Sequence, residues 1–478
     1  MAADVTDALG APAPGGAPVA FPSVSTDTRA ISPGALFVAL EGERFDAHAF
    51  LAEAKSKGAG AAVVRKGTPP VPGLPFFEVD DTLRALGALA AFHRRRFAIP
   101  VAAVAGSNGK TTTKEMLASI LRTRGPALAT DGNLNNEIGV PLTVFRMSAE
   151  HRAAVVELGM SAPGELARLT AIARPDAGVV TLVAAEHLEF LKDFDGVADA
   201  EGELYRGLLP GSFAVVNADD PRCVAQAERA AAGVKKICFG RSPLADVRLV
   251  EVTALGVEGM EILLEGEEWE GGGGAGRVVP DTKLQRRRVA VRLGFVGEHN
   301  AMNAAAAAAT ARALSYSFEE ISSGLESARP YSHRSRVVAG IGAITILDDC
   351  YNASPTSMEA ALATLASLVA GGKRRAVAVL GDMLELGAFE EEAHRTLGRD
   401  AAGAGVSIAA FFGPRSSLTF KEFSSSLPSD SSAHFAEIEP LLAWLRPRLA
   451  PGDVVLVKGS RGMKLERVVD ALAVRAGT

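Results

Sequence analysis

A glycine-containing turn between an apolar run and a threonine-rich segment is the strongest chemical signal in this chain. Residues 101–106 are VAAVAG and are followed by SNGKTT. Backbone N–H groups in such a turn, with a helix N-terminus behind them, form a cradle for phosphate. Lys110 is placed to reach the β and γ phosphates of a nucleoside triphosphate, and Thr111 to offer its hydroxyl to Mg²⁺. We expect phosphate contacts along the whole turn: Gly106, Ser107, Asn108, Gly109, Lys110, Thr111 and Thr112.

The turn has the shorter GxxGKT form, because the first glycine of the longer GxxxxGK[ST] motif would fall at Val104. The alternative is a chance turn with a surface lysine, which the strand–turn–helix setting disfavours. An NKxD motif for guanine is absent from the sequence, which counts against a GTPase switch.

Metal ligands are expected where neighbouring strands end, since open α/β sheets bind ligands at the carboxyl ends of their strands. Glu157 ends the apolar run AAVV, and His187 follows the run TLVAAE. A carboxylate in that place suits Mg²⁺, although a lone Glu is also often a cap or a surface acid. A lone His is more often structural than a ligand.

Composition limits the class of protein. The chain has 478 residues, 48% of them hydrophobic, and a net charge of −6, which favours neither disorder nor nucleic-acid binding by a basic surface. No apolar run reaches the roughly 18 residues of a membrane span, and the N-terminus lacks the features of a signal peptide. Three cysteines form no disulfide framework. We expect a cytoplasmic α/β protein with several domains.

The apolar runs divide the chain into parts. Residues 1–15 are rich in Ala, Pro and Gly and are expected to be frayed, and residues 23–79 are expected to form a small α/β module with a helix at 47–58. A helix is predicted over 82–97, then strand–helix alternation to 328, typical of a parallel sheet. A glycine-rich insert at 265–277 predicts a hairpin tip or loop, and the alanines at 304–309 predict close helix packing. A third α/β pattern begins near 329.

Several motifs in order resemble those of the Mur ligases. They are Gly106–Met116 (GSNGKTTTKEM), Gly132–Thr143 (GNLNNEIGVPLT), Gly297–Asn303 (GEHNAMN), Asp348–Met358 (DDCYNASPTSM), Gly381–Gly387 (GDMLELG) and Lys458–Gly462 (KGSRG), with STDTR at 25–29 and PGALFV at 33–38 nearer the N-terminus. The likeness extends from about residue 23 to 470. It is closest to the member that joins D-alanyl-D-alanine to UDP-MurNAc-tripeptide, and the DNPR-type motif usual in the member adding the third amino acid is absent.

The resemblance implies an α/β fold of three domains. These are a smaller α/β N-terminal domain binding the UDP substrate (1–98), a central P-loop domain whose parallel sheet has helices on both faces (99–328), and a Rossmann-like α/β C-terminal ligase domain (329–478). It also implies a monomeric cytoplasmic enzyme of peptidoglycan precursor synthesis, with ATP and Mg²⁺ as cofactors and UDP-MurNAc-tripeptide and D-Ala-D-Ala as small-molecule partners. No nucleic-acid partner and no membrane span are expected.

The resemblance also assigns roles to matching residues. Lys110 would bind phosphate, Thr111 and Glu157 one Mg²⁺, and His187 a second metal ion. Asn300 and Asn303 would bind adenine, Asp349 the ribose, and Arg334 would reach the phosphates from the C-terminal domain. The plainer alternatives are a helix cap for the asparagines, a solvated charge for Arg334 and a strand-end acid for Asp349.

One position departs from the family pattern. Mur ligases usually carry a carbamylated lysine about fourteen residues after the metal histidine, and counting from His187 reaches Glu201. Glutamate is already a carboxylate, so we expect Glu201 to support the second metal ion and to make the enzyme independent of bicarbonate. The alternative is a solvated helix acid beside Asp199 and Glu203.

For the substrate, the resemblance points to the N-terminal domain and one central loop. Thr28 matches a UDP-contacting position, and Arg44 and Phe45 lie in the loop expected nearby, where Ala47 replaces a frequent glycine. Asn135 and Asn136 are candidate substrate contacts, and equally ordinary turn formers.

The chemistry implied is amide formation without a protein nucleophile. A substrate carboxylate attacks the γ-phosphate to give an acyl phosphate, which an amine then opens, so positioning and charge neutralisation carry the catalysis. Two other functions stay open: an amide ligase of the same superfamily acting on a different acid, and a non-catalytic nucleotide-binding relative.

Overall fold

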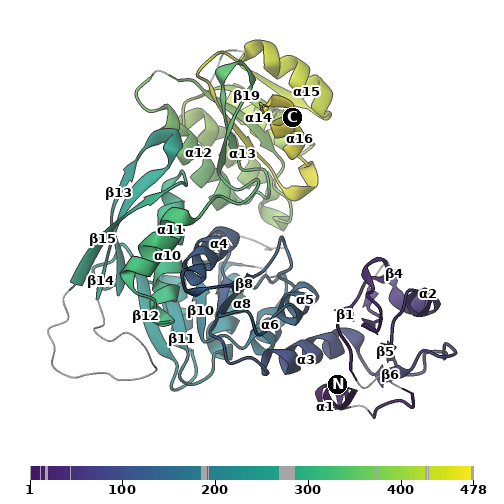
Figure 1. Cartoon of the computed structure of the whole chain (residues 1–478). Helices are drawn as coiled ribbons and strands as arrows, with labels where there is room; N and C mark the ends of the chain where they lie inside the picture. Colours follow the sequence, from purple (N-terminus) through teal and green to yellow (C-terminus); the bar gives the residue numbers. More distant parts are fainter. Residues whose placement is uncertain are drawn as a thin grey trace.

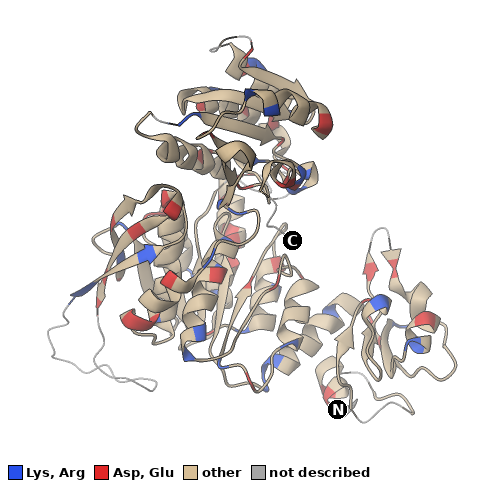
Figure 2. Ribbon diagram, turned by 45° about the horizontal axis from the view of Figure 1, so that its top comes forward, with Lys and Arg blue, Asp and Glu red and all other residues tan. Residues whose placement is uncertain are grey.

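The structure is a computed structural model that describes residues 2–10, 12–16, 20–42, 45–184, 191, 193–267, 286–372, 374–425, 428 and 430–474. Figure 1 shows α/β bodies in chain order, with the N-terminal one joined to the central one through α3 (Thr82–Arg94). The expected α/β fold with a central P-loop sheet is confirmed. In Figure 2, Lys and Arg are interspersed with Asp and Glu over these bodies, as the near-balanced charge predicts.

The N-terminal sheet is parallel, in the order β1-β2-β5-β6. Its elements are β1 (Val24–Ser25), β2 (Leu36–Val38), β5 (Ala61–Arg65), β6 (Phe76–Val79), the short pair β3 (Glu41–Gly42) and β4 (Phe45–Asp46), the 3₁₀ turns η1 (Thr28–Ala30) and η2 (Ala47–Phe50), and helices α1 (Ala2–Leu9) and α2 (Leu51–Ser56). The helix expected at 47–58 is therefore divided between η2 and α2.

The prediction of a frayed N-terminus was wrong for residues 2–9. Helix α1 contacts α3, and Val5 is buried at 6% exposure beside Leu86 and Leu89. Val5, Ala8 and Leu9 lie three and four residues apart, so they share one helical face and cover the core. The Pro- and Gly-rich composition after residue 10 concealed this spacing.

The central sheet has the order β15-β14-β13-β12-β11-β10-β7-β9-β8. Neighbouring strands pair in parallel from β13 to β8 in this order, whereas β14 and β15 continue the sheet in antiparallel fashion. The strands are β7 (Val101–Ala105), β8 (Ala127–Ala129), β9 (Ala153–Glu157), β10 (Ala177–Val180), β11 (Phe213–Asn217), β12 (Lys235–Gly240), β13 (Val247–Ala254), β14 (Met260–Glu267) and β15 (Arg286–Leu293). Of the insert expected at 265–277, residues 265–267 belong to β14, and residues 268–277 lie outside the described residues.

Alternation along the strands divides the core between the two faces of this sheet. The helices that cover it are α4 (Lys110–Leu121), α5 (Gly139–Phe145), α6 (Glu165–Ala173), α8 (Phe194–Gly207), α9 (Pro221–Ala227), α10 (Glu298–Ala313) and α11 (Phe318–Ser327). Ala102, Val104 and Val155 pack with α4, α10 and α11, whereas Ala103 and Val156 pack with α5, α6, α8 and α9. The alanines at 304–309 are fully buried in α10, so the predicted close packing is confirmed.

The C-terminal sheet has the order β16-β17-β21-β18-β19-β20, parallel except for the edge strand β16, and it has the expected Rossmann-like layout. Its strands are β16 (Arg336–Ala339), β17 (Thr345–Asp348), β18 (Ala376–Gly381), β19 (Val406–Phe412), β20 (Ser432–Phe435) and β21 (Val454–Lys458). Its helices are α12 (Pro355–Val369), α13 (Glu390–Gly403), α14 (Ser416–Ser424), α15 (Ile438–Leu445) and α16 (Glu466–Leu472). Within the described ranges, no helix has the length and apolar character needed to cross a membrane.

Candidate active site

The phosphate turn joins β7 to α4, and two glycines make its shape possible. Gly106 has φ +119°, and a Cβ there would lie 2.1 Å from Thr181 Oγ1. Gly109 has φ +83°, and a Cβ there would lie 2.2 Å from Asn303 Oδ1. Both positions combine a left-handed backbone with a close neighbour, which only glycine tolerates. The turn is therefore fixed by contacts on both sides.

The strand beside the turn anchors it. Thr181, just after β10, donates from Oγ1 to Asn108 O at 2.5 Å and to Ala105 O at 3.2 Å. Ser107 donates from its backbone N to Leu182 O and from Oγ to Ala184 O. These bonds hold the backbone of the turn, as a pre-organised anion cradle requires.

The predicted phosphate-binding side chains follow at the start of α4. Lys110 begins the helix, and its Nζ donates to Gly106 O at 2.5 Å and to Ser107 O at 3.1 Å. Thr111 is buried at 2% exposure, whereas Thr112 is only partly buried. The lysine ammonium thus lies over the turn, next to the helix N-terminus where a phosphate would be favoured.

Glu157 lies beside this turn at the end of β9. It is the register partner of Val104 in β7, and its side chain projects from the same sheet face as Val155, the face that α4 covers. The carboxylate is 2% exposed; Oε1 accepts a 2.9 Å hydrogen bond from Asn135 Nδ2, and Thr130 Oγ1 accepts from the Glu157 backbone N.

Glu157 Oε2 is buried and has no hydrogen-bond partner among the described residues. A buried carboxylate oxygen without a donor is costly unless a cation or another ligand satisfies it. Mg²⁺ takes oxygen ligands, and the Thr111 hydroxyl lies at the start of the helix that packs on β9. The residues present therefore fit a magnesium ion.

The two predicted adenine asparagines lie behind the phosphate turn at the start of α10. Asn303 Nδ2 donates to Asn300 Oδ1 at 3.0 Å, and Asn300 Nδ2 donates to Val296 O at 2.8 Å. Both side chains are buried, at 2% and 6% exposure for Asn300 and Asn303 respectively. Neither acts as an N-cap, since Gly297 holds that position.

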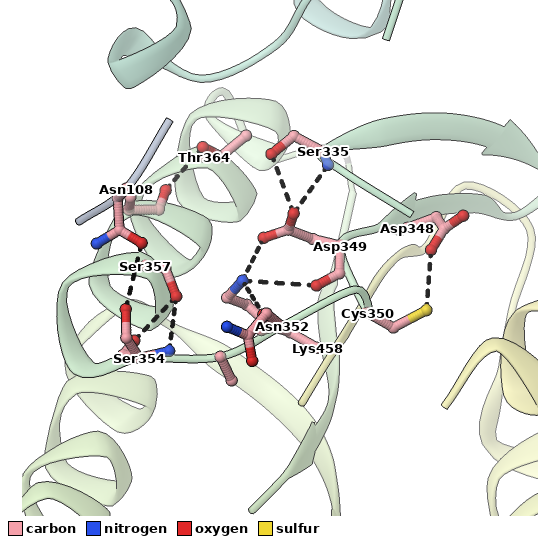
Figure 3. A network of polar contacts seen from close by, with 12 residues as sticks. Asn108, Ser335, Asp348, Asp349, Cys350, Asn352, Ser354, Ser357, Thr364 and Lys458 are labelled. Carbon is pink, nitrogen blue, oxygen red and sulfur yellow. Dashed lines mark hydrogen bonds and ion pairs between the residues drawn. The ribbon is translucent and has the colours of Figure 1, made fainter. Parts of the chain in front are cut away.

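Asp349 lies in a polar network of the C-terminal domain, which Figure 3 shows from close by. Lys458 Nζ lies 2.7 Å from Asp349 Oδ2 and is only 3% exposed, and Ser335 N donates to Oδ1 at 2.9 Å. A carboxylate can accept about four hydrogen bonds, so this one retains capacity for a ribose hydroxyl. Asp349 is thus a fixed acceptor rather than a solvated strand-end acid.

Arg334 lies in the linker between α11 and β16. Its guanidinium carbon is 4.1 Å from the centre of the Tyr351 ring, and Arg461 approaches the same ring at 5.6 Å. Arg334 Nε is buried and lacks a hydrogen-bond partner in the described part of the chain. The arginine is therefore held by an aromatic face with a donor still unused, which fits an anion-binding role better than a solvated charge.

Two hydrogen bonds join the central and C-terminal domains at this site. Ser354 Oγ donates to Asn108 Oδ1 at 3.4 Å, which links the start of α12 to the phosphate turn (Figure 3). His299 Nε2 lies 3.5 Å from Ser335 Oγ, and burial lowers the pKa of this histidine, which favours its neutral form. The phosphate turn and the Asp349 network are therefore parts of one site.

Glu201 is not a solvated acid. It lies within α8 at 2% exposure, whereas the side chain of Asp199 is 60% exposed and pairs with Arg229. Glu203 accepts from the backbone N of Gly164 and Ala167 at the start of α6. The plainer alternative for Glu201 is wrong, because the core-facing side of α8 includes this carboxylate.

The remaining predicted residues fall into two groups. His187 and Arg44 lie outside the described residues. Thr28 donates to Glu53 Oε1 at 3.1 Å, and Phe45, 58% exposed, stacks on Phe50 with ring centres 5.3 Å apart. Asn136 Oδ1 accepts from the backbone N of residues 138 and 139 at the start of α5, a contact typical of an asparagine that forms a turn.

Sequence reasoning missed Thr181, Thr130, Lys458 and Ser354. Thr130 and Thr181 directly follow the strands β8 and β10, so the strand-end argument used for Glu157 applied to them too. Lys458 ends β21 in the same way. Ser354 precedes a proline at the start of α12, which is a helix N-cap signal and carried no hint of its contact with Asn108.

Comparison with known proteins agrees with this arrangement. Family models match the "Mur ligase family, catalytic domain" at residues 21–94, the "Mur ligase middle domain" at 104–311 and the "Mur ligase, glutamate ligase domain" at 333–461. The UDP-N-acetylmuramoyl-tripeptide–D-alanyl-D-alanine ligase of Escherichia coli K12 is 38% identical over 461 residues, 96% of this chain and 95% of that protein. The Bacillus subtilis 168 ligase of the same name is 34% identical, covering 94% and 92% respectively.

Solved structures give the same result. A crystal structure of MurF from Acinetobacter baumannii superposes with a TM-score of 0.85 at 32% identity and covers 98% of both chains. MurF from Thermotoga maritima in complex with ADP has a TM-score of 0.77 at 27% identity, covering 94% of this chain and 96% of its own. With matched domains along the chain and relatives similar over almost their full length, this chain belongs to the Mur ligase family.

Proposed function

We propose that this chain is the ATP-dependent ligase that joins D-alanyl-D-alanine to UDP-MurNAc-tripeptide in peptidoglycan precursor synthesis. One observation carries the proposal: the phosphate turn lies beside the buried Glu157 carboxylate, which has one oxygen unused, in a chain that matches ligases of that name over almost its whole length. A triphosphate and a cation are what such a pair of features can bind.

The reaction has two steps. The terminal carboxylate of the tripeptide attacks the γ-phosphorus of ATP, the bond to the β-γ bridging oxygen breaks, and ADP leaves an acyl phosphate behind. The amino group of D-Ala-D-Ala then attacks the acyl carbon, phosphate departs with the carboxyl oxygen it received, and the amine loses a proton to give the amide. Neither step needs a protein nucleophile, since positioning and charge neutralisation lower both barriers.

Different residues of the chain bind different parts of ATP and the metal ions. Backbone N–H groups of residues 106–112 and Lys110 hold the β and γ phosphates, and Arg334 neutralises charge from the C-terminal side. Asn300 and Asn303 bind the adenine, and Asp349 binds the ribose. Thr111 and Glu157 would hold one Mg²⁺ and His187 a second metal ion, and these cations would compensate charge on the phosphoryl oxygens.

Glu201 is proposed to stand in for the carbamylated lysine usual in this family. Its burial supports the proposal, because a carboxylate that faces the interior of the domain can act as a metal ligand there, whereas a solvent-facing acid on α8 could not. The ligase should then show the same rate with and without bicarbonate, and Glu201→Ala should lower it. Stimulation by bicarbonate, or a fully active alanine variant, would contradict this role.

The domain limits are proposed near residues 98 and 328. The sheets occupy residues 24–79, 101–293 and 336–458, so both limits fall between sheets. The N-terminal domain would bind the UDP moiety through Thr28, Arg44 and Phe45, with Asn135 and Asn136 nearer the tripeptide. We further propose a cytoplasmic monomer that closes on ATP, detectable as compaction in small-angle scattering with an ATP analogue.

The deciding experiment measures ADP release with UDP-MurNAc-tripeptide and D-Ala-D-Ala, against single amino acids as acceptors. Release that depends on both named substrates is expected. Equal or faster release with a single amino acid would instead indicate another amide ligase of the superfamily. ADP binding without turnover for any acceptor would indicate a non-catalytic nucleotide-binding protein.

A further inference from the structure

A compact group of metal-ligating side chains lies at the end of β17, apart from the phosphate turn. Asp348 ends the strand, Cys350 follows, and His333 approaches from the linker after α11. Asp348 Oδ1 lies 3.2 Å from His333 Nδ1 and 3.1 Å from Cys350 Sγ, and Cys350 Sγ lies 3.6 Å from His333 Nδ1. A nitrogen, a sulfur and an oxygen donor therefore converge, all within 4.8 Å of one another.

These spacings are close to those of a tetrahedral metal site. Zn²⁺ binds sulfur at about 2.3 Å and nitrogen or oxygen at about 2.0–2.2 Å, so its ligand atoms lie roughly 3.3–3.6 Å apart. The three separations among Asp348 Oδ1, His333 Nδ1 and Cys350 Sγ, which are 3.1, 3.2 and 3.6 Å, need only small rotations to reach that range. Asp348 is 2% exposed and the His333 side chain 26%, so one side is open to solvent for a water ligand.

The donor set indicates which cations suit it. Thiolate and imidazole together select a borderline or soft divalent ion such as Zn²⁺, whereas Mg²⁺ prefers oxygen ligands. Burial, with the Asp348 carboxylate nearby, raises the pKa of the Cys350 thiol, which favours its protonated form when no metal ion is bound. A coordinating cation reverses this preference, because it deprotonates the thiol it binds.

The surroundings connect the cluster with the ligase site. His333 and Ser335 have φ of +63° and +47°, so the backbone on both sides of Arg334 is in the left-handed region that favours glycine. Such a conformation persists only where contacts hold it, and the His333–Asp348 and Ser335–Asp349 hydrogen bonds do so. Figure 3 shows Asp348 and Cys350 next to Asp349, which lies between them in the chain.

We propose that His333, Asp348 and Cys350 bind one divalent cation of the Zn²⁺ class, with water as a further ligand. The cation would join the interdomain linker to the end of β17 and hold Arg334 and Asp349 in their present relation. The site is separate from the proposed Mg²⁺ site and does not rest on the proposed function.

The test uses the full-length protein stripped with a chelator and then titrated with Co²⁺ in excess Mg²⁺, which occupies oxygen-ligand sites. Wild type should bind one equivalent with a thiolate-to-cobalt charge-transfer band. Cys350→Ser should abolish the band, and His333→Ala should weaken Co²⁺ binding by roughly 100-fold or more, since even a residue that only supports a ligand is worth about 10–100-fold. Cys238→Ser, a partly buried cysteine in β12, is the matched control and should keep the band.

Absence of the band in wild type, or its persistence in Cys350→Ser, would overturn the proposal. Because Cys350 is buried and its variant can fail to fold, X-ray absorption of zinc-loaded wild type provides an independent measurement. A sulfur neighbour at about 2.3 Å is expected, and a shell of nitrogen and oxygen alone would overturn the assignment. The thermal midpoint of wild type should also rise with Zn²⁺, as it does when a ligand binds only the folded state, and an unchanged midpoint would count against the site.

Discussion

Asn135 Nδ2 donates a 2.9 Å hydrogen bond to Glu157 Oε1, while Oε2 of the same carboxylate has no hydrogen-bond partner in the described part of the chain. The amide fixes the orientation of the carboxylate and satisfies one oxygen. The other oxygen is left for a cation. Asn135, expected from sequence as a substrate contact or a turn former, is thus a positioning residue for the proposed magnesium ligand.

Replacing Asn135 with alanine should therefore impair magnesium use. We expect turnover to fall by about 10–100-fold, the range for losing a partner of a metal ligand, and the Mg²⁺ concentration for half-maximal rate to rise. ADP release measured across a Mg²⁺ series checks this. Asn133→Ala, at an exposed position of the same loop, is the control. If both variants kept the wild-type magnesium requirement, Asn135 would have no such role.

Gly109→Ala should abolish tight nucleotide binding. The new Cβ would meet Asn303 Oδ1, whereas Gly211, with φ +92°, has open space around it. Both variants incur left-handed strain of about 1–2 kcal/mol, but only Gly109→Ala also deforms the phosphate turn. Calorimetry should show ADP binding weakened more than tenfold by Gly109→Ala and unchanged by Gly211→Ala, with both less stable in urea. Normal ADP affinity in Gly109→Ala would exclude this turn as the phosphate site.

The Tyr351 ring should strengthen ATP binding, because it holds the Arg334 guanidinium in place. A cation–aromatic contact contributes about 0.5–2 kcal/mol, so Tyr351→Leu should raise the KM for ATP by roughly 2–30-fold. Tyr351→Phe keeps the aromatic face 4.1 Å from the guanidinium carbon and should behave as wild type. Initial rates over an ATP series separate KM from kcat. Equal defects in both variants would assign the effect to the hydroxyl instead.

Glu320 makes stability depend on pH. Two hydrogen bonds from Arg124, at 2.6 and 2.7 Å, lower the pKa of Glu320 from 4.5 to about 2. Because the unfolded chain binds this proton more readily, the stabilisation is complete above pH 4.5 and is lost as the pH falls toward 2. With both side chains partly exposed, Glu320→Gln should lower the free energy of unfolding by about 0.5–1 kcal/mol at neutral pH.

Urea unfolding of wild type and Glu320→Gln at pH values from neutral down to about 3.5 tests this prediction. The difference in the free energy of unfolding between the two proteins should become smaller as the pH falls. Glu319→Gln is the control, because Glu319 forms a more exposed ion pair with Arg287 on the same helix. A difference that stays constant with pH would show that the Arg124 pairing is not its source.

Local sequence determined the parts of the site that depend on near neighbours. The apolar alternation of 101–105 specifies a buried strand, and glycines at 106 and 109 permit the left-handed turn that leads into α4. The same alternation placed Glu157 at a strand end, and the motif order gave the family. These features depend on the backbone preferences and the burial of residues close together in the chain, and both can be predicted from the local sequence.

Tertiary structure decided what depends on which strands and domains become neighbours. The pairing of β7 with β9 and β10 brings Glu157 and Thr181 to the phosphate turn, and β21 brings Lys458 to Asp349. The burial of Glu201 and of helix α1 likewise depends on what packs over them. Contacts between distant residues follow from sheet order and domain packing, which no local pattern of residues encodes.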